Sequence, residues 1–243
     1  DAVSGTPGVH ALSDAGPQDL DAAQVFAQES QWCDAAVAAG KDPIAARVAA
    51  LQGRARALAT QVVQQAPWAS AGTEDHRLPD GRLRGVGLAT AQVADQDEEG
   101  QPGTVWSAWV AEVAVHPQTG RIDVTRVVAG HDSERLQPAQ AASLQGQIVH
   151  DEPWLMQGAQ RLLGTEAAFD DWRAARPTPL HDTARSVAPY APEQALVNQG
   201  RLALDGVLTL PAAAAIANAI HDATGVRLRE APFDANQLRL ALG

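Results

Sequence analysis

The chain has few residues that could crosslink it, anchor it in a bilayer or bind an anionic polymer. Its 243 residues include one cysteine, Cys33, which excludes an internal disulfide and an all-cysteine metal site. No apolar run approaches the roughly 20 residues that a membrane-spanning helix needs. Lys and Arg total 18 against 29 Asp and Glu, and the net charge of −11 argues against binding to nucleic acid or an anionic membrane.

The composition predicts a folded protein with a real core. Apolar residues make up 45% and charged residues 19% of the chain, which is far from the pattern of disordered segments. No signal-like segment opens the sequence, and the first residue is Asp1 rather than Met, as expected of a processed or trimmed start. We expect a cytoplasmic or periplasmic protein, soluble or held at a membrane through partners.

Three helices are expected in the first third of the chain. Asp21 to Ala39 carries an apolar stripe and is followed by a glycine. Asp42 and Pro43 form an N-cap with a first-turn proline and open a short second helix. Arg54 to Gln65 is the third. The stripe of the first helix comprises Val25, Phe26, Trp32, Cys33, Ala36 and Val37.

The hydrophobic period then changes to that of strands. Arg84 to Val93 is a glycine-rich strand candidate, and an acidic loop follows over Asp95 to Gly103. Thr104 to Val115 is apolar on both faces, which predicts a central strand that is covered on both sides. His116 to Gly120 is a hairpin connection, after which Arg121 to Ala129 pairs back. Three antiparallel strands in a row indicate a sheet with helices packed on it.

The remainder is expected to return to helix and loop. Ala139 to Leu163 is predicted as mostly helical, and Gly164 to Gly200 as a long wrapping loop. Leu210 to Arg229 opens with an alanine-rich helix that Gly225 ends, and Val226 to Arg229 alternates as in a half-buried strand. A helix so rich in alanine is able to approach another backbone closely, so we expect it to dock on something large. The fold class is α+β, with a mixed, largely antiparallel sheet covered by helices.

Three blocks of the sequence resemble one protein family. VAEVAVHPQTGRIDVTRVVAGHD (Val110 to Asp132) looks like the strand–turn–strand of the molybdenum-binding subunits of the xanthine oxidase family. AAGKDPIAARVAAL (Ala38 to Leu51) is similar to the preceding helix pair there, and AIANAIHDATGVRLREAPF (Ala215 to Phe233) to the closing helix and strand. The blocks occur in the family's order, and the isoquinoline oxidoreductase and aldehyde dehydrogenase branch is the most similar.

This resemblance implies the C-terminal part of a larger molybdopterin-binding domain. Residues 1–83 would supply a loop and helices, 84–132 strands, and 133–243 helices, a long loop and a closing helix and strand. The implied enzyme oxidises an aldehyde or an N-heterocycle with oxygen from water. Its cofactor is molybdenum on molybdopterin, in some members as the cytosine dinucleotide, shared here with another chain. Electrons leave through iron–sulfur clusters in a small partner subunit, and a cytochrome c or flavin subunit is a further candidate partner.

The implied active-centre positions depart from the family's pattern. The family's catalytic glutamate, in a Gly-Glu-Pro segment, aligns with Gly206, and Asp205 is the one nearby carboxylate. A general base must lie within hydrogen-bond reach of its proton, so a shift of one residue matters. Gln157 and Gly158 match the family's glutamine–glycine pterin segment loosely. Residues Gly5 to Gly8 carry glycine where the family has arginine.

Each of these positions also has an ordinary structural interpretation. Gln157 and Gly158 suit a helix surface, and Asp205 suits a turn before glycine. The adjacent pair His131 and Asp132 is expected to point to opposite sides of a strand. Two functions therefore stay open: a subunit that takes part in the oxidation, and a catalytically degenerate structural subunit that completes and docks such a complex. Metal ligands supplied by the chain are not expected.

Overall fold

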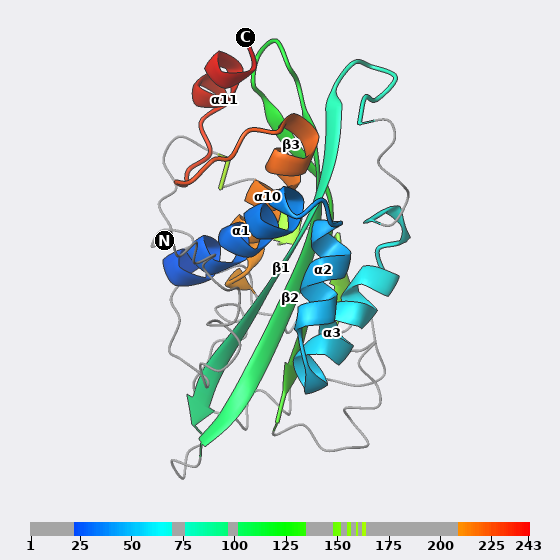
Figure 1. Cartoon of the computed structure of the whole chain (residues 1–243), viewed down its shortest axis with the longest axis vertical. Coiled ribbons are helices and arrows are strands. Elements are labelled where there is room, and N and C mark those ends of the chain that lie inside the picture. The colour runs from blue at the N-terminus through cyan, green and yellow to red at the C-terminus, as the bar shows by residue number, and fades with distance from the viewer. Residues whose placement is uncertain are drawn as a thin grey trace, which may run out of the picture.

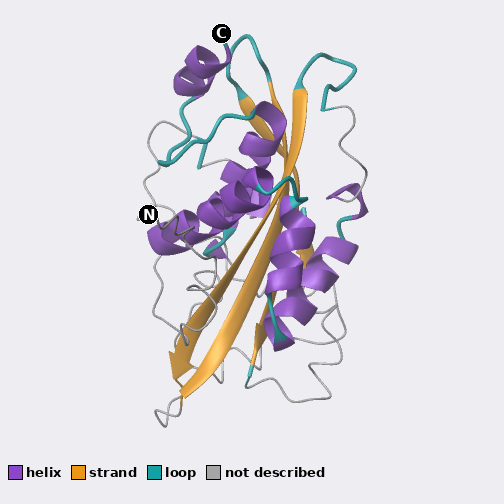
Figure 2. Cartoon of the chain, viewed as in Figure 1, coloured by secondary structure: helices purple, strands orange, loops and turns teal. Residues whose placement is uncertain are grey.

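The computed structural model describes residues 22–69, 76–96, 102–134, 148–151, 155, 156, 159, 162, 163 and 209–243. In these ranges a four-stranded sheet of order β1-β2-β3-β4 carries helices on both faces, as Figures 1 and 2 show. The helices α1 and α10 lie on one side, and α2 and α3 lie on the other. This arrangement confirms the predicted α+β class.

The three long strands form regular antiparallel pairs. β1 (Leu83–Gln96) pairs with β2 (Pro102–Val115) over its whole length, and β2 pairs with β3 (Ile122–Ser133) around a bulge. Thirteen of the fourteen β2 residues are buried, since helices cover both of its faces. The predicted central strand is therefore confirmed. The acidic loop is shorter than expected, because β1 continues to Gln96 and β2 begins at Pro102.

The helices of the first third begin and end close to the predicted residues. α1 spans Ala22–Ala38, α2 spans Pro43–Ala50 and α3 spans Gly53–Gln64, followed by the short 3-10 helix η2 (Pro67–Ala69). Asp42 caps α2 by accepting a hydrogen bond from the Ala45 N–H. One residue of the predicted apolar stripe is wrong: Val37 is 46% exposed.

The alanine-rich helix α10 (Ala212–Thr224) packs directly on β1 and β2. Its alanines meet the small residues of alternate β1 positions, and a Cβ atom added at Gly85 or Gly87 would overlap the α10 backbone. Gly225 ends the helix in the left-handed region, at φ 72°. The large element on which this helix docks therefore lies within the chain itself, and its burial gives no evidence for a neighbouring chain.

The last residues lie against α1 and against the turn between β2 and β3, where Gly120 contacts the backbone of Ala235. Phe233 is buried against Phe26 of α1, with ring centroids 6.1 Å apart. The helix α11 (Ala235–Leu242) follows and buries Leu238. The prediction of a strand at Val226 to Arg229 is wrong, because this segment forms no part of the described sheet.

The prediction of helix over Ala139 to Leu163 is wrong at its centre. Ile148–His150 forms β4, which pairs antiparallel with Val128, Ala129 and Gly130 of β3. Ile148 and Val149 are β-branched and suit a strand, and the free edge of β3 offers them hydrogen bonds that local sequence does not reveal. No helix in the described ranges is long and apolar enough to cross a membrane.

Candidate functional site

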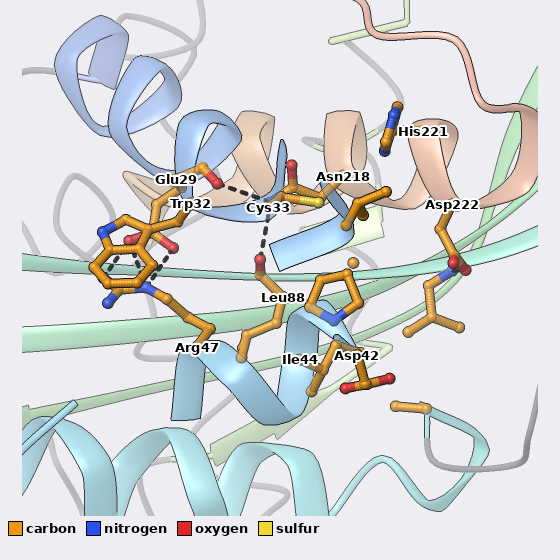
Figure 3. A pocket seen from close by; sticks show the side chains of 15 residues that line it. Glu29, Trp32, Cys33, Asp42, Ile44, Arg47, Leu88, Asn218, His221 and Asp222 are labelled. Atoms are coloured by element: carbon orange, nitrogen blue, oxygen red, sulfur yellow. Dashed lines mark hydrogen bonds and ion pairs between the residues drawn. The ribbon is translucent and has the colours of Figure 1, made fainter. Parts of the chain in front are cut away.

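A cavity of about 260 Å³ lies where α1, α2 and α10 converge on the outer edge of β1. Figure 3 shows the side chains around it. Its lining brings together residues that are nearly two hundred positions apart in the sequence. The lining residues used below are Glu29, Trp32, Cys33, Asp42, Arg47, Leu88, Asn218, His221 and Asp222.

One wall of the cavity is an ion pair between α1 and α2. The Arg47 guanidinium donates from Nε to both Glu29 carboxylate oxygens, at 3.1 and 3.0 Å, and stacks 5.1 Å from the centre of the Trp32 ring. The Thr90 hydroxyl of β1 donates to the same carboxylate. Glu29 is 4% exposed, so its charge is both buried and fully paired. This group therefore joins elements together and has no free lone pair directed at a ligand.

A buried amide of α10 forms the floor. Asn218 donates from Nδ2 to the Leu88 carbonyl at 3.1 Å and to the Glu29 carbonyl at 3.4 Å. Its own oxygen accepts from Arg227 at 2.8 Å, and Arg227 in turn pairs with Asp34 of α1. Every hydrogen bond of the Asn218 side chain is made to another group of the protein. These bonds fix α10 between α1 and β1.

The remaining polar lining is acidic or neutral. The Asp222 carboxylate accepts the Val86 N–H at 2.8 Å, yet burial raises the pKa of this carboxyl above its ordinary value. Burial also raises the pKa of the Cys33 thiol. Burial lowers the pKa of the His221 imidazole, and the nearby Arg227 charge lowers it further. A neutral thiol and a neutral imidazole make a poor nucleophile pair. Neither the Cys33 thiol nor the His221 imidazole therefore has the environment of an activated nucleophile or its base.

The residues predicted to contact a cofactor or to act near the metal are Gln157, Gly158, Asp205 and Gly206, and all four lie outside the described residues. The segment Gly5 to Gly8 also lies outside them. These predictions stay untested.

The structure places His131 and Asp132 on opposite faces of β3, as expected. Asp132 pairs with Arg54 of α3 at 2.6 and 2.8 Å, whereas the alternation of the strand directs His131 toward the α10 side. Within the described ranges, no group of three or more His, Cys, Asp or Glu residues is arranged to hold a metal ion.

Sequence patterns did not reveal the polar residues that line this site. Glu29, Asn218 and Asp222 interrupt otherwise apolar helix faces, and that interruption was the available signal. Their partners lie in β1, 61 to 136 residues away, so no local pattern could identify them.

Comparison with known proteins gives one relative of substantial identity. A subunit of the nicotinate dehydrogenase of Pseudomonas putida is 34% identical over 232 residues, which cover 90% of this chain and 18% of the relative. The chain therefore spans less than a fifth of the length of that protein. No family model matches the sequence.

Two solved structures share the fold. The aldehyde oxidoreductase of Desulfovibrio desulfuricans superposes with a TM-score of 0.56 at 11% identity, over 91% of this chain and 41% of that one. The aldehyde oxidoreductase of Desulfovibrio gigas gives 0.55 at 14% identity, with the same coverage. At such identities the likeness concerns the fold alone.

Proposed function

We propose that the chain is one part of a molybdopterin-dependent oxidoreductase of the xanthine oxidase family, in the branch that oxidises N-heterocycles or aldehydes with water. The observation that carries the proposal is the 34% identity to the nicotinate dehydrogenase subunit along nearly the whole chain. The likeness to aldehyde oxidoreductases supports the same fold. Because the chain spans 18% of that relative and 41% of those structures, the activity requires further polypeptide.

The cavity between α1, α2 and α10 does not fit the pterin cofactor. The phosphate of molybdopterin is anionic, whereas the cavity edge carries the Asp42 and Asp222 carboxylates, and the Arg47 guanidinium there is already paired with Glu29. We therefore assign no step of the reaction to this cavity. Contacts to a cofactor shared with another part of the enzyme are proposed for Gln157, Gly158 and Gly206, with Asp205 the nearest candidate base.

A second function is favoured by the ion pairs of the buried carboxylates. Glu29, Glu112 and Asp132 are the three that are buried in the described ranges, and each is bound by at least one arginine. A carboxylate held in this way is directed at its arginine and not at a substrate, as a general base would have to be. This favours a structural subunit that completes and docks the complex, with the chemistry, the iron–sulfur clusters and any cytochrome c or flavin group supplied by partner chains.

Metal and pterin analysis tests the main proposal. The protein that carries this sequence is isolated in its native assembly, and molybdenum, oxidised pterin and the reduction of a dye by nicotinate or an aldehyde are measured. We expect about one molybdenum per assembly and substrate-dependent dye reduction. A native assembly without molybdenum or pterin would contradict the proposal.

A pair of substitutions then separates the two functions. Asp205→Asn in the intact enzyme removes a base and retains the size of the side chain, and Asp234→Asn is the matched control at a helix cap. If this chain takes part in the chemistry, Asp205→Asn lowers kcat at full molybdenum content. An unchanged kcat supports the structural function.

A further inference from the structure

The N-terminus of α10 is buried but has no side-chain cap. The first N–H groups of a helix have no partner inside it, and a side chain at the N-cap normally accepts one of them. In α10 the N-cap is Pro211, which makes no such hydrogen bond. Ala212, Ala213 and Ala214 are each at most 3% exposed, and the described residues offer their N–H groups no acceptor. This helix end therefore presents buried donors and the positive end of the helix dipole.

Two further donors lie on the sheet on the side that α10 covers. Ser107 is 1% exposed and Trp109 is 0% exposed, and in the part of the chain that the structure describes neither the hydroxyl nor the indole N–H has a hydrogen-bond partner. Both residues belong to β2 and are two positions apart, so their side chains lie on the same face. Trp109 packs in one core cluster with the alanines of α10, which identifies that face as the one beneath the helix.

The contacts between α10 and β1 place the first turn of the helix beside these donors. Cβ atoms added at Gly85 and Gly87 would meet α10 carbonyl oxygens that are one helical turn apart, so two strand residues correspond to about one turn. Going from Gly85 to Gly87 leads back along α10 toward its N-terminus, and the next step brings Ala89 beside the first turn. Trp109 pairs with Ala89 across the strands, and Ser107 pairs one step further along β1. The two donors therefore lie beside the N-terminus of α10 and just beyond it.

These groups determine the chemistry of what they can bind. The helix N–H groups and the Trp109 indole only donate, and the Ser107 hydroxyl is able to donate as well. A peptide segment would bring N–H groups of its own, whereas a phosphate or carboxylate group brings acceptors alone. Uncapped helix N-termini bind such anions. In residues 201–208, which lead to α10, Asp205 is the one carboxylate that could take the same place.

We propose that the N-terminus of α10, Ser107 and Trp109 bind an oxyanion, the phosphate or carboxylate group of a small molecule that is not part of this chain. The inference rests on the proposed function for its source, which is the phosphate of the pterin cofactor or the carboxylate of a substrate such as nicotinate. The site is distinct from the cavity at the edge of β1, because that cavity is lined by Asn218, His221 and Asp222 from the other half of α10.

Binding measurements on the native assembly test the inference. Ser107→Ala removes the hydroxyl, and Trp109→Phe removes the indole N–H and retains an aromatic ring. Ser30→Ala is the matched control, because Ser30 is also buried without a described hydrogen-bond partner but lies on α1. Inorganic phosphate and nicotinate are titrated against the melting temperature of the assembly, and the rate at which bound pterin is lost on dialysis is measured separately.

We expect Ser107→Ala and Trp109→Phe to weaken one of these three interactions roughly tenfold or more, as the loss of a hydrogen bond to a charged group does, and Ser30→Ala to change none. Faster loss of pterin assigns the site to the cofactor phosphate. Weaker nicotinate binding assigns it to a substrate carboxylate, and weaker phosphate binding alone to free phosphate. The phosphate titration does not need molybdenum, so it tests the inference even in an assembly that contradicts the proposed function.

Two results would overturn the inference. One is equal behaviour of Ser107→Ala, Trp109→Phe and Ser30→Ala in all three measurements. The other is an electron cryomicroscopy map of the assembly in which the Asp205 carboxylate, or another group of this chain, accepts the hydrogen bonds of Trp109 and of the α10 N-terminus. Ser107→Ala is the smaller change and decides the question if Trp109→Phe does not assemble.

Discussion

The sheet is fixed to its helices in two ways: by close backbone packing under α10, and by charged groups on the α2 and α3 face and at the edge where α1 meets α2. In the first, α10 lies against Gly85 and Gly87, so near that a single added carbon at either glycine would overlap its backbone. In the second, buried carboxylates bind arginines of the helices and strands. The packing of α10 on β1 depends on shape and tolerates no added atom. The stability of an ion pair depends instead on which of its two members a substitution leaves behind.

One arrangement of charged groups occurs three times, twice on the face covered by α3 and once at the edge of the sheet, where α1 meets α2. In each case a buried carboxylate binds an arginine, and that arginine stacks on a tryptophan. The three groups are Glu29 with Arg47 and Trp32, Asp132 with Arg54 and Trp106, and Glu112 with Arg126 and Trp68. The guanidinium–ring distances are 5.1, 5.6 and 5.0 Å in the same order. Arginine suits this role because its planar fork binds a carboxylate while its flat surface contacts an aromatic ring. Tryptophan is therefore used here to hold charges in place as well as to fill space.

The largest effect is expected at the closely packed face. Gly87→Val places a branched side chain where the backbone of Ala215 and Ala219 already lies, so α10 must separate from β1. We expect a loss of about 4 kcal/mol or more in unfolding free energy, or failure to fold. Gln92→Val in the same strand is the control, since that side chain is only partly buried, and it should change stability by less than about 0.5 kcal/mol. Equal effects of the two in thermal unfolding would contradict the close-packing account.

The next effect distinguishes the two members of one ion pair on the face covered by α3. Arg54→Ala leaves Asp132, 3% exposed, as an unpaired buried charge, and should cost about 3 kcal/mol. Asp132→Ala leaves Arg54, 33% exposed, which water can still reach, and should cost less. Urea unfolding of both variants measures the asymmetry. If the aspartate variant were the less stable, the unpaired buried carboxylate would not be the main cause of the destabilisation.

Two carboxylates should respond to pH in opposite directions. Burial raises the pKa of Glu112, but hydrogen bonds from Arg126, Thr125 and Arg84 outweigh it, and the net pKa lies below the ordinary value. Its contribution to stability is therefore present above the unfolded-state pKa and is lost as pH falls through the folded-state pKa. Glu112→Gln should destabilise the protein at neutral pH by about 1–3 kcal/mol and flatten the acid limb of the stability curve.

Asp222, near the C-terminal end of α10, has the reverse sign. Burial raises its pKa, with the Asp42 charge contributing and the Val86 N–H and the His76 and Arg84 charges opposing. Its favourable contribution is present below the unfolded-state pKa and is lost as pH rises through the folded-state pKa. Asp222→Asn retains an oxygen for the Val86 N–H, so it should be neutral or stabilising at pH 7. Denaturant unfolding between pH 3 and pH 7 compares both variants, and parallel curves would contradict this assignment.

The smallest effect is expected on the outer surface of α1. Val37→Ala removes atoms from a side chain that is 46% exposed, and should cost less than about 0.5 kcal/mol. Val25 on the same helix is 1% exposed, so Val25→Ala leaves a cavity in the core and should lower the unfolding free energy by about 2 kcal/mol. Similar midpoints for both variants in thermal unfolding would mean that α1 is not oriented as described.

Local signals in the sequence predicted most of the described elements. The Asp42 cap, the Gly225 stop and the two-faced apolar run of β2 each depend on neighbours within a few residues, and all three are confirmed. β4 was missed because three residues carry little pattern, and its place depends on the free edge of β3. The exposed position of Val37 follows from where α2 and α10 happen to leave α1 uncovered, which periodicity alone cannot show.

The candidate cavity was less predictable than the fold. Asn218 and Glu29 act through bonds to Leu88 and Thr90, and such pairings over a hundred or sixty positions leave no trace in local sequence. The bulge that faces Glu112 admits an extra residue, Thr125, whose hydroxyl completes the carboxylate's bonding. Geometry of this kind becomes visible only when the strands are in register. The resemblance of whole blocks, by contrast, was visible in the sequence because it does not depend on any single contact.

Native mass spectrometry of the protein that carries this sequence, isolated from its source, tests the central claim most directly. The account predicts that residues 1–243 occur in a species much heavier than they are alone, and that this species retains a molybdenum–pterin group under gentle ionisation. A species of the mass of residues 1–243 alone, with no bound cofactor, would contradict it.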